Sequence, residues 1–171
     1  MSRVLLADAS PNAQRMGEQI LRSEGYEVVT VTDGDTAVLR LADVDPDVVL
    51  ADAALPRRNG YDLCHFIKSH ARYRYIRVVL TAGITAELDA ERAQRFGSDG
   101  TLRKPFEATS LLATVRALAE LVRKERAVRE PASGPAMDPA RVRAAVTLAL
   151  EAAMPAMIQE VTERVLEALK D

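Results

Sequence analysis

The chain has 171 residues, of which 48% are hydrophobic and 28% charged, so it can bury one sizeable core and leaves little for a second large domain. A formal net charge of −2 gives no general attraction to nucleic acids or anionic membranes. The single Cys64 cannot form an internal disulfide bond, and Asp8 interrupts the first apolar run too early for a signal-peptide core or a membrane span. We therefore expect a cytoplasmic protein that binds neither nucleic acid nor membrane.

Short apolar segments alternate with segments of helical periodicity through the first two thirds of the chain. The predicted strands are residues 4–7, 26–31, 48–51, 76–80 and, more weakly, 100–102. The first predicted helix begins after Ser10 and Pro11, a cap followed by proline, and ends near Gly25. The later predicted helices occupy about 35–43, the residues after Asn59-Gly60, 86–96, and the residues after Pro105.

The strand around 48–50 is apolar on both faces, as expected for a parallel strand covered by helices on each side. Five strand–helix units of this kind predict an open, doubly wound α/β sheet. Ligands bind such sheets at the carboxyl ends of the strands. The polar residues at those ends are Asp8, Asp52, Thr81 and Lys104. We expect them to converge on one cleft.

Two carboxylates, a hydroxyl and an ammonium form a set suited to phosphoryl transfer. The carboxylates can hold a hard divalent cation, and one of them can attack phosphorus. The metal and Lys104 would neutralise the developing charge, while Thr81 would bind a phosphoryl oxygen. Each residue also has a simpler explanation, since Asp8 can cap the first helix and Thr81 can be an ordinary β-branched strand residue. Lys104 is harder to explain by packing, because burying an unpaired ammonium is costly.

Four motifs at these strand ends resemble the receiver domains of bacterial response regulators, typified by the chemotaxis response regulator. They are V-L-L-A-D-A-S-P at 4–11, V-V-L-A-D-A-A-L-P at 48–56, V-V-L-T-A at 78–82 and L-R-K-P-F at 102–106. The resemblance covers about residues 1–122 and implies a flavodoxin-like, five-stranded parallel sheet in the order 2-1-3-4-5. It also implies a two-component phosphorelay protein with a histidine kinase as partner, rather than an enzyme that acts on a small molecule.

The resemblance further implies a role for each residue at the strand ends. Asp52 would be the phosphoacceptor, and Thr81 and Lys104 would contact the phosphoryl group. Asp8, Asp52 and the backbone carbonyl of Ala54 would bind Mg²⁺. The proline after Lys104 matches one that follows lysine through a cis peptide bond in the family.

Two positions depart from the family pattern. Ala9 replaces an acidic residue that contacts the metal, and two unit charges about 4 Å apart interact by roughly 4 kcal/mol at an effective dielectric near 20. We therefore expect weak Mg²⁺ binding. Thr101 replaces an aromatic residue that moves together with the strand-four hydroxyl. Retention of Asp52, Thr81 and Lys104 favours phosphorylation, whereas the two departures favour the alternative of a pseudo-receiver, a phosphorylation-independent interaction or localisation module.

The composition changes after the receiver region. The fifth helix is predicted to run on to about Arg129, so 123–137 holds a helix extension and a linker rich in proline and small residues. In the tail, 138–171, apolar residues recur at helical spacing on both sides of Pro155, which predicts two short amphipathic helices. A tail this short cannot bury such residues by itself. We expect it to bind another protein or a second copy of itself.

Overall fold

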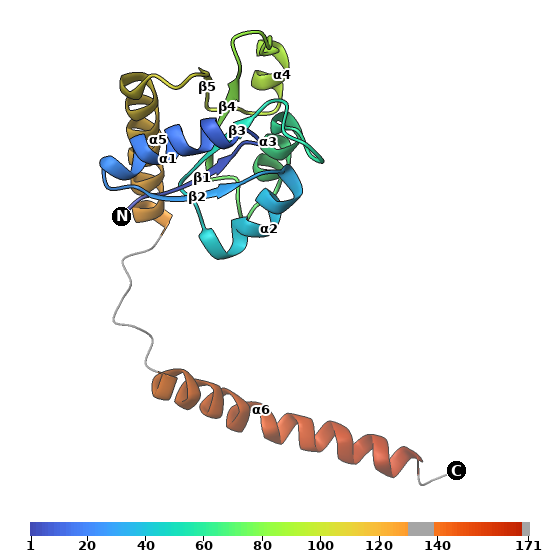
Figure 1. The fold of residues 1–171 in the computed structure, drawn as a ribbon. Helices are drawn as coiled ribbons and strands as arrows, with labels where there is room; N and C mark the ends of the chain where they lie inside the picture. Colours follow the sequence, from blue (N-terminus) through green and yellow to red (C-terminus); the bar gives the residue numbers. More distant parts are fainter. Residues whose placement is uncertain (130–138, 169–171) are drawn as a thin grey trace. The chain divides into compact units, whose positions relative to one another are not determined.

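A computed structural model describes residues 1–129 and 139–168, and the predicted linker lies outside them. The chain divides into a compact unit at Met1–Arg129 and a second unit from Glu130 onward (Figure 1). None of the described helices has the length and apolar character that crossing a membrane requires.

The first unit is built on a five-stranded parallel sheet in the order β2-β1-β3-β4-β5. Its strands are β1 (Arg3–Ala7), β2 (Glu27–Val31), β3 (Val48–Asp52), β4 (Arg77–Ala82) and β5 (Gly100–Arg103). The predicted fold class and strand order are confirmed. Asp52 at the end of β3 pairs with Thr81 on β4, so two of the predicted site residues are neighbours across the sheet.

Helices connect the strands and cover the sheet on both sides. They are α1 (Pro11–Ser23), α2 (Gly34–Val44), α3 (Gly60–Ser69), α4 (Ala90–Arg95) and α5 (Ala108–Arg129). The first four begin at a side-chain cap, since Ser10, Asp33, Asn59 and Asp89 each accept a hydrogen bond from the backbone N–H three residues on. These caps explain where the helices start.

The core lies in two layers because alternate residues of each strand face opposite sides. Val4, Leu6, Val48 and Leu50 belong to the apolar cluster that α1 and α5 cover. Leu5, Ala7, Val49 and Ala51 belong to the cluster that α2, α3 and α4 cover. Figure 1 shows these two helix layers on either side of the sheet. Burial on both faces accounts for the uninterrupted apolar runs of β1 and β3.

Helix α4 is shorter than predicted. The apolar pattern indicates a helix over 86–96, but α4 spans only Ala90–Arg95 because Asp89 caps it. The backbone N–H of Asp89 also donates a hydrogen bond to the Tyr61 hydroxyl at 2.8 Å. This contact with α3 fixes the end of the preceding loop, and periodicity alone could not reveal it.

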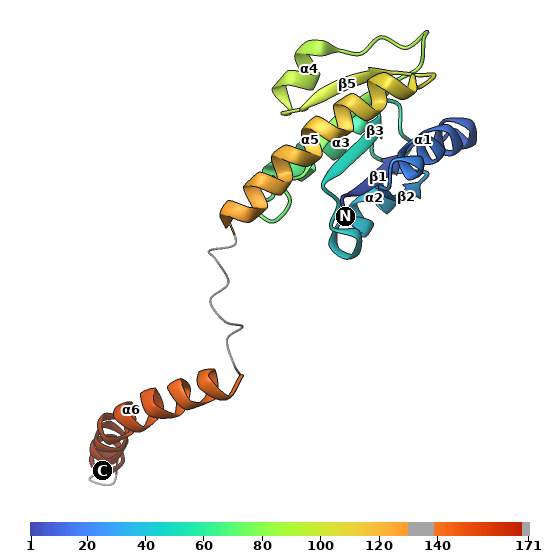
Figure 2. The same cartoon turned by 90° about the vertical axis from the view of Figure 1, so that its left-hand side faces the viewer.

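The prediction of two short helices in the tail is wrong. The second unit contains one helix, α6 (Pro139–Ala168), with Pro155 in its interior. A proline there removes one helical hydrogen bond and costs about 3 kcal/mol. The alanines on either side, Ala152, Ala153 and Ala156, are the best helix formers and favour continuation. Figure 2 shows α6 changing direction along its length instead of breaking.

Helix α5 extends to Arg129 as predicted, and its last turns are held against the first unit. Arg126 forms ion pairs with Asp45 at 2.9 Å and Asp47 at 3.3 Å. Its guanidinium also lies 4.9 Å from the ring centre of Tyr75, whose hydroxyl donates to Asp45. These residues lie beside the ends where β3 and β4 begin, at the opposite edge of the sheet from Asp52.

Candidate functional site

Lys104 joins the predicted site residues of β1 and β3. Its Nζ lies 2.7 Å from Asp8 Oδ2 and 2.8 Å from Asp52 Oδ2. Asp8 and Thr81 are fully buried, whereas the side chain of Asp52 keeps 14% of its surface exposed. The structure thus brings the four strand-end residues together, and Asp52 is the carboxylate that solvent can reach.

The charge of Lys104 is stabilised by its two partners. Burial alone would lower the pKa of the ammonium, but the hydrogen bonds to Asp52 and Asp8 outweigh it and raise that pKa above its ordinary value. The backbone N–H of Lys104 donates to the carbonyl of Ala82 at 2.8 Å, which ties the residue to the end of β4. The peptide bond to Pro105 is cis, in agreement with the resemblance.

Thr81 presents a polar atom that lacks a partner. Its Oγ1 is buried and makes no hydrogen bond within the described part of the chain. Leaving a buried polar group unsatisfied costs about 1–3 kcal/mol, and native structures do so rarely. The backbone carbonyl of Thr81 accepts from the N–H of Ala53 at 2.8 Å, so the hydroxyl belongs to the residue that anchors the chain next to Asp52. Thr81 pairs with Asp52 across the sheet, so this buried hydroxyl is on the strand next to that carboxylate.

The loop after Asp52 packs against two glycines. A Cβ atom at Gly60 would lie 2.5 Å from the carbonyl oxygen of Asp52. A Cβ atom at Gly34 would lie 2.0 Å from the carbonyl oxygen of Arg58. Any other residue would displace the loop, so both positions require glycine. The loop carries Ala54, whose N–H donates to Asp52 Oδ1 at 3.1 Å. The exposed residue Ala54 is therefore held beside the carboxylate.

Sequence reasoning missed two supports of Asp8. The side chain of Gln14 donates to the backbone carbonyls of Asp8 and Val31, at 2.5 and 3.1 Å. The backbone N–H of Ser10 donates to Asp8 Oδ1 at 2.8 Å. A signal for Gln14 was present, because it shares one face of α1 with the buried Leu21.

Asp8, Asp52 and the carbonyl of Ala54, which are predicted to bind Mg²⁺, are hard oxygen donors. Mg²⁺ prefers such ligands, usually one or two carboxylates with several waters, so the residues fit this ion. Ala9 is exposed and adds no side-chain oxygen. Among the described residues no group of three or more His, Cys, Asp or Glu side chains is placed to hold a metal. Thr101 is also exposed, so neither Ala9 nor Thr101 contributes its side chain to the core.

A cavity of about 330 Å³ opens beside Lys104. It lies between the start of α1 and the segment that joins β5 to α5, and its lining includes Asn12, Met16 and Phe106. The site therefore adjoins a partly apolar hollow large enough to receive side chains of a partner.

This fold is that of a receiver domain. Residues 4–116 match the family model described as the response regulator receiver domain. The chain therefore belongs to the response regulator receiver family. Receiver domains act in two-component signalling, interact with histidine kinases and generally bind Mg²⁺.

Individual relatives agree with this assignment. PilG from Pseudomonas aeruginosa is 30% identical over 115 residues, which are 67% of this chain and 85% of that protein. The response regulator PleD from Caulobacter vibrioides is 35% identical over 135 residues, 78% of this chain but only 30% of PleD. The crystal structure of the chemotaxis response regulator CheY4 from Vibrio cholerae has a TM-score of 0.63 and 26% identity, covering 69% of this chain and 98% of that one.

Proposed function

We propose that the protein is a cytoplasmic response regulator whose Asp52 accepts a phosphoryl group from a histidine kinase, and that it signals by protein contacts rather than as an enzyme. The observation that carries the proposal is the position of Lys104 Nζ between Asp8 and Asp52. On the strand next to Asp52, the hydroxyl of Thr81 has no hydrogen-bond partner among the described residues. A cation, a reachable carboxylate and a free hydroxyl together suit a phosphoryl group.

In the proposed transfer, a carboxylate oxygen of Asp52 attacks phosphorus while the P–N bond to the kinase histidine breaks. The bonding electrons stay on that nitrogen, and the histidine leaves as neutral imidazole when its other ring nitrogen carries a proton. Lys104 faces the negative charge that develops, and Thr81 donates to a phosphoryl oxygen. Mg²⁺ would supply further charge neutralisation from a site formed by Asp8, Asp52 and the Ala54 carbonyl.

The modification would change the balance of charges around Lys104. A phosphoryl group adds about −1.5 to −2 charge at pH 7 and three strong acceptor oxygens. It would compete with the carboxylates for the single ammonium and would give Thr81 the partner that it lacks. The receiver would then shift between two packings that partners distinguish. With Thr101 on β5, that shift would proceed without an aromatic side chain at this position.

The pseudo-receiver is the second candidate, and Ala9 favours it. Without an acid at position 9, the described site holds two carboxylates, and Lys104 bridges them and balances half of their charge without a metal. Such a domain could serve as a constitutive interaction or localisation module. The absence of any modification by a phosphodonor would support this function.

We also propose that the tail, 138–171, is a protein-interaction element and binds neither DNA nor membrane. Within α6, four glutamates outnumber three arginines, which gives no attraction to polyanions. Nine large apolar side chains in its described part are at least half exposed and need a protein surface to cover them. Deleting 131–171 should leave a folded receiver with a lower association state, measured by sedimentation.

The test of phosphorylation is incubation of the full chain with acetyl phosphate and Mg²⁺, followed by intact mass measurement. We expect the mass of one phosphoryl group to be added to the wild type and not to Asp52→Asn. Asp43→Asn is the matched control, because Asp43 is an exposed carboxylate on α2 whose ion-pair partner among the described residues is Arg40, at 2.9 Å. Unchanged mass, together with no response to beryllofluoride, would refute the proposal in favour of the pseudo-receiver.

A further inference from the structure

We propose that α6 pairs with α6 of a second copy of this chain in an antiparallel, two-fold symmetric contact whose axis passes between Pro155 and Ala156. This inference rests on the proposed role of the tail as a protein-interaction element and names its partner. It concerns only residues of the described helix, Pro139–Ala168.

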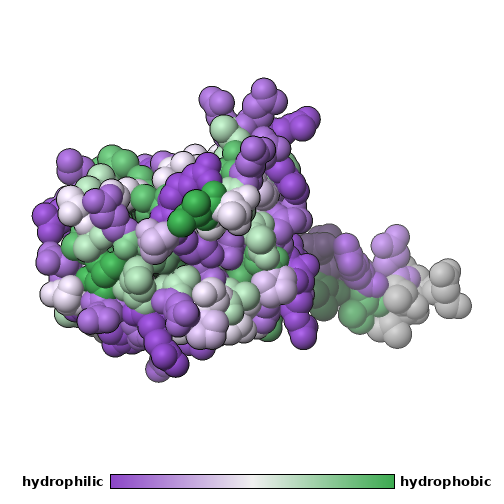
Figure 3. All heavy atoms as spheres, turned by 45° about the horizontal axis from the view of Figure 1, so that its top comes forward, coloured by the Kyte–Doolittle hydropathy of each residue, from purple (hydrophilic) through white to green (hydrophobic). Residues whose placement is uncertain are grey.

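The side chains of α6 leave a large apolar surface uncovered. Nine big hydrophobic residues in its described part are between 50% and 67% exposed. They are Val146, Leu148, Leu150, Met154, Met157, Ile158, Val161, Val165 and Leu166. Figure 3 shows hydrophobic residues of the tail at the surface among hydrophilic ones. A helix with this much exposed apolar surface is an interaction site.

Six of these side chains lie on one face of the helix. They are Val146, Leu150, Met154, Met157, Val161 and Val165, separated by intervals of four, four, three, four and four residues. At 3.6 residues per turn this spacing confines them to an arc of about 100°, the width of an apolar stripe that packs against one neighbour. The stripe therefore offers a single continuous contact surface.

The stripe is complementary to its own reversed copy. A two-fold contact places each residue opposite the one that lies equally far on the other side of the axis. The facing pairs are Val146 with Val165, Leu150 with Val161, and Met154 with Met157. Positions pair in this way in many helices with regular spacing, so the evidence for self-association comes from the types of the facing residues. Branched residues face branched residues at the ends, flexible methionines face each other at the centre, and the small Ala153 faces the large Ile158 at the flank of the stripe.

The charges along α6 favour the antiparallel orientation. Residues 139–154 contain two arginines and one glutamate, a net charge of +1, whereas 156–168 contain three glutamates and one arginine, a net charge of −2. An antiparallel pair brings the positive half of one helix beside the negative half of the other, and a parallel pair would align the two acidic halves. Opposed helix dipoles favour the same orientation.

Cysteine cross-linking in the full chain tests this arrangement. Val146→Cys and Val165→Cys are purified separately, mixed and oxidised, and the native Cys64 stays out of reach because it is fully buried. Two copies of position 146 would lie about 28 Å apart along the antiparallel pair. A disulfide needs Cα atoms within roughly 7 Å, so we expect the mixed cross-link to exceed either self-cross-link by about tenfold or more. Leu148→Cys, from the opposite face, is the control that should not cross-link to position 165.

The outcomes of the cross-linking distinguish the possible partners of α6. Efficient self-cross-linking of Val146→Cys would show a parallel pair and overturn the proposed orientation. No cross-link, together with a monomer in sedimentation across micromolar concentrations, would overturn pairing with a second copy and leave a foreign protein as the partner. The same cross-linking in the Asp52→Asn background should be unchanged. Failure of pairing and failure of phosphorylation are therefore distinguishable.

Discussion

Replacing Thr81 by valine should stabilise the resting protein and weaken its activated state. The Thr81 side chain is fully buried and its hydroxyl has no partner in the described structure. Removing an unsatisfied buried hydroxyl regains part of a penalty of about 1–3 kcal/mol, so we expect the free energy of unfolding to rise by about 1 kcal/mol in Thr81→Val. A hydrogen bond to a charged group contributes about 1.5–3 kcal/mol, so the affinity for beryllofluoride should fall roughly 10- to 100-fold.

Urea unfolding with and without beryllofluoride and Mg²⁺ measures both effects on the same samples. With a slope of about 1–3 kcal/mol per molar urea, the resting midpoint should rise by about 0.5 M. Thr101→Val is the matched control, because this threonine is exposed and its substitution should change stability by less than about 0.5 kcal/mol. A Thr81→Val protein that is less stable at rest, or that keeps its affinity for beryllofluoride, would refute this account of the hydroxyl.

Three further substitutions address the metal, the cation and the helix extension. Ala9→Asp should tighten Mg²⁺ binding by about tenfold or more, as measured by the thermal shift of the protein in a Mg²⁺ titration. An unchanged affinity would contradict the role assigned to position 9. Lys104→Met leaves two close carboxylates without their cation, so its free energy of unfolding should fall by about 3 kcal/mol, and Mg²⁺ should restore more stability in this variant than in the wild type. Burial alone would raise the pKa of Asp45, but hydrogen bonds from its tyrosine and arginine neighbours lower it below the ordinary 3.8. A carboxyl with a lowered pKa contributes stability that is present above about pH 3.8 and is lost as the pH falls below it. Asp45→Asn should therefore lower the free energy of unfolding by less than about 1 kcal/mol at neutral pH. In acid denaturation curves, the difference in stability between this variant and the wild type should vanish.

The sequence predicted the sheet and the convergence of its strand ends because both follow from local patterns. The apolar runs within β1 and β3, at 4–7 and 48–51, are uninterrupted, and an aspartate directly follows each of them. The short α4 and the continuous α6 were not predicted, because the first depends on the Asp89 cap and its contact with Tyr61, and the second on alanines that outweigh Pro155. Hydrophobic periodicity reveals neither a tertiary contact nor the balance between helix-forming and helix-breaking residues.

The candidate site was predicted as a set of residues but not as an arrangement. Lys104 lies 96 positions from Asp8 and 52 from Asp52, and nothing local indicates that one ammonium serves both carboxylates. The missing partner of Thr81 is likewise a property of the packed structure. The roles of these residues in phosphorylation and metal binding stay predictions until the assays above are done.

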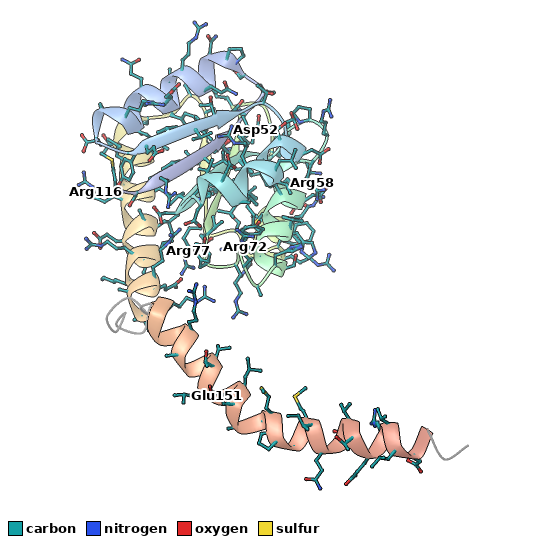
Figure 4. All side chains as sticks on the ribbon, turned by 90° about the horizontal axis from the view of Figure 1, so that it is seen from below. Asp52, Arg58, Arg72, Arg77, Arg116 and Glu151 are labelled. Atoms are coloured by element: carbon teal, nitrogen blue, oxygen red, sulfur yellow. The ribbon has the colours of Figure 1, made fainter. Side chains whose placement is uncertain are left out.

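The docked end of α5 determines where the chain leaves this receiver. Arg126 holds the helix at the edge where the strands begin, and Figure 4 labels Asp52 and Arg77 at opposite ends of the neighbouring strands β3 and β4. The chain therefore leaves the domain at Arg129, on the edge away from Asp52. A domain fastened by this edge can be anchored to an assembly while a kinase approaches the other, so anchoring and phosphotransfer need not compete for one surface.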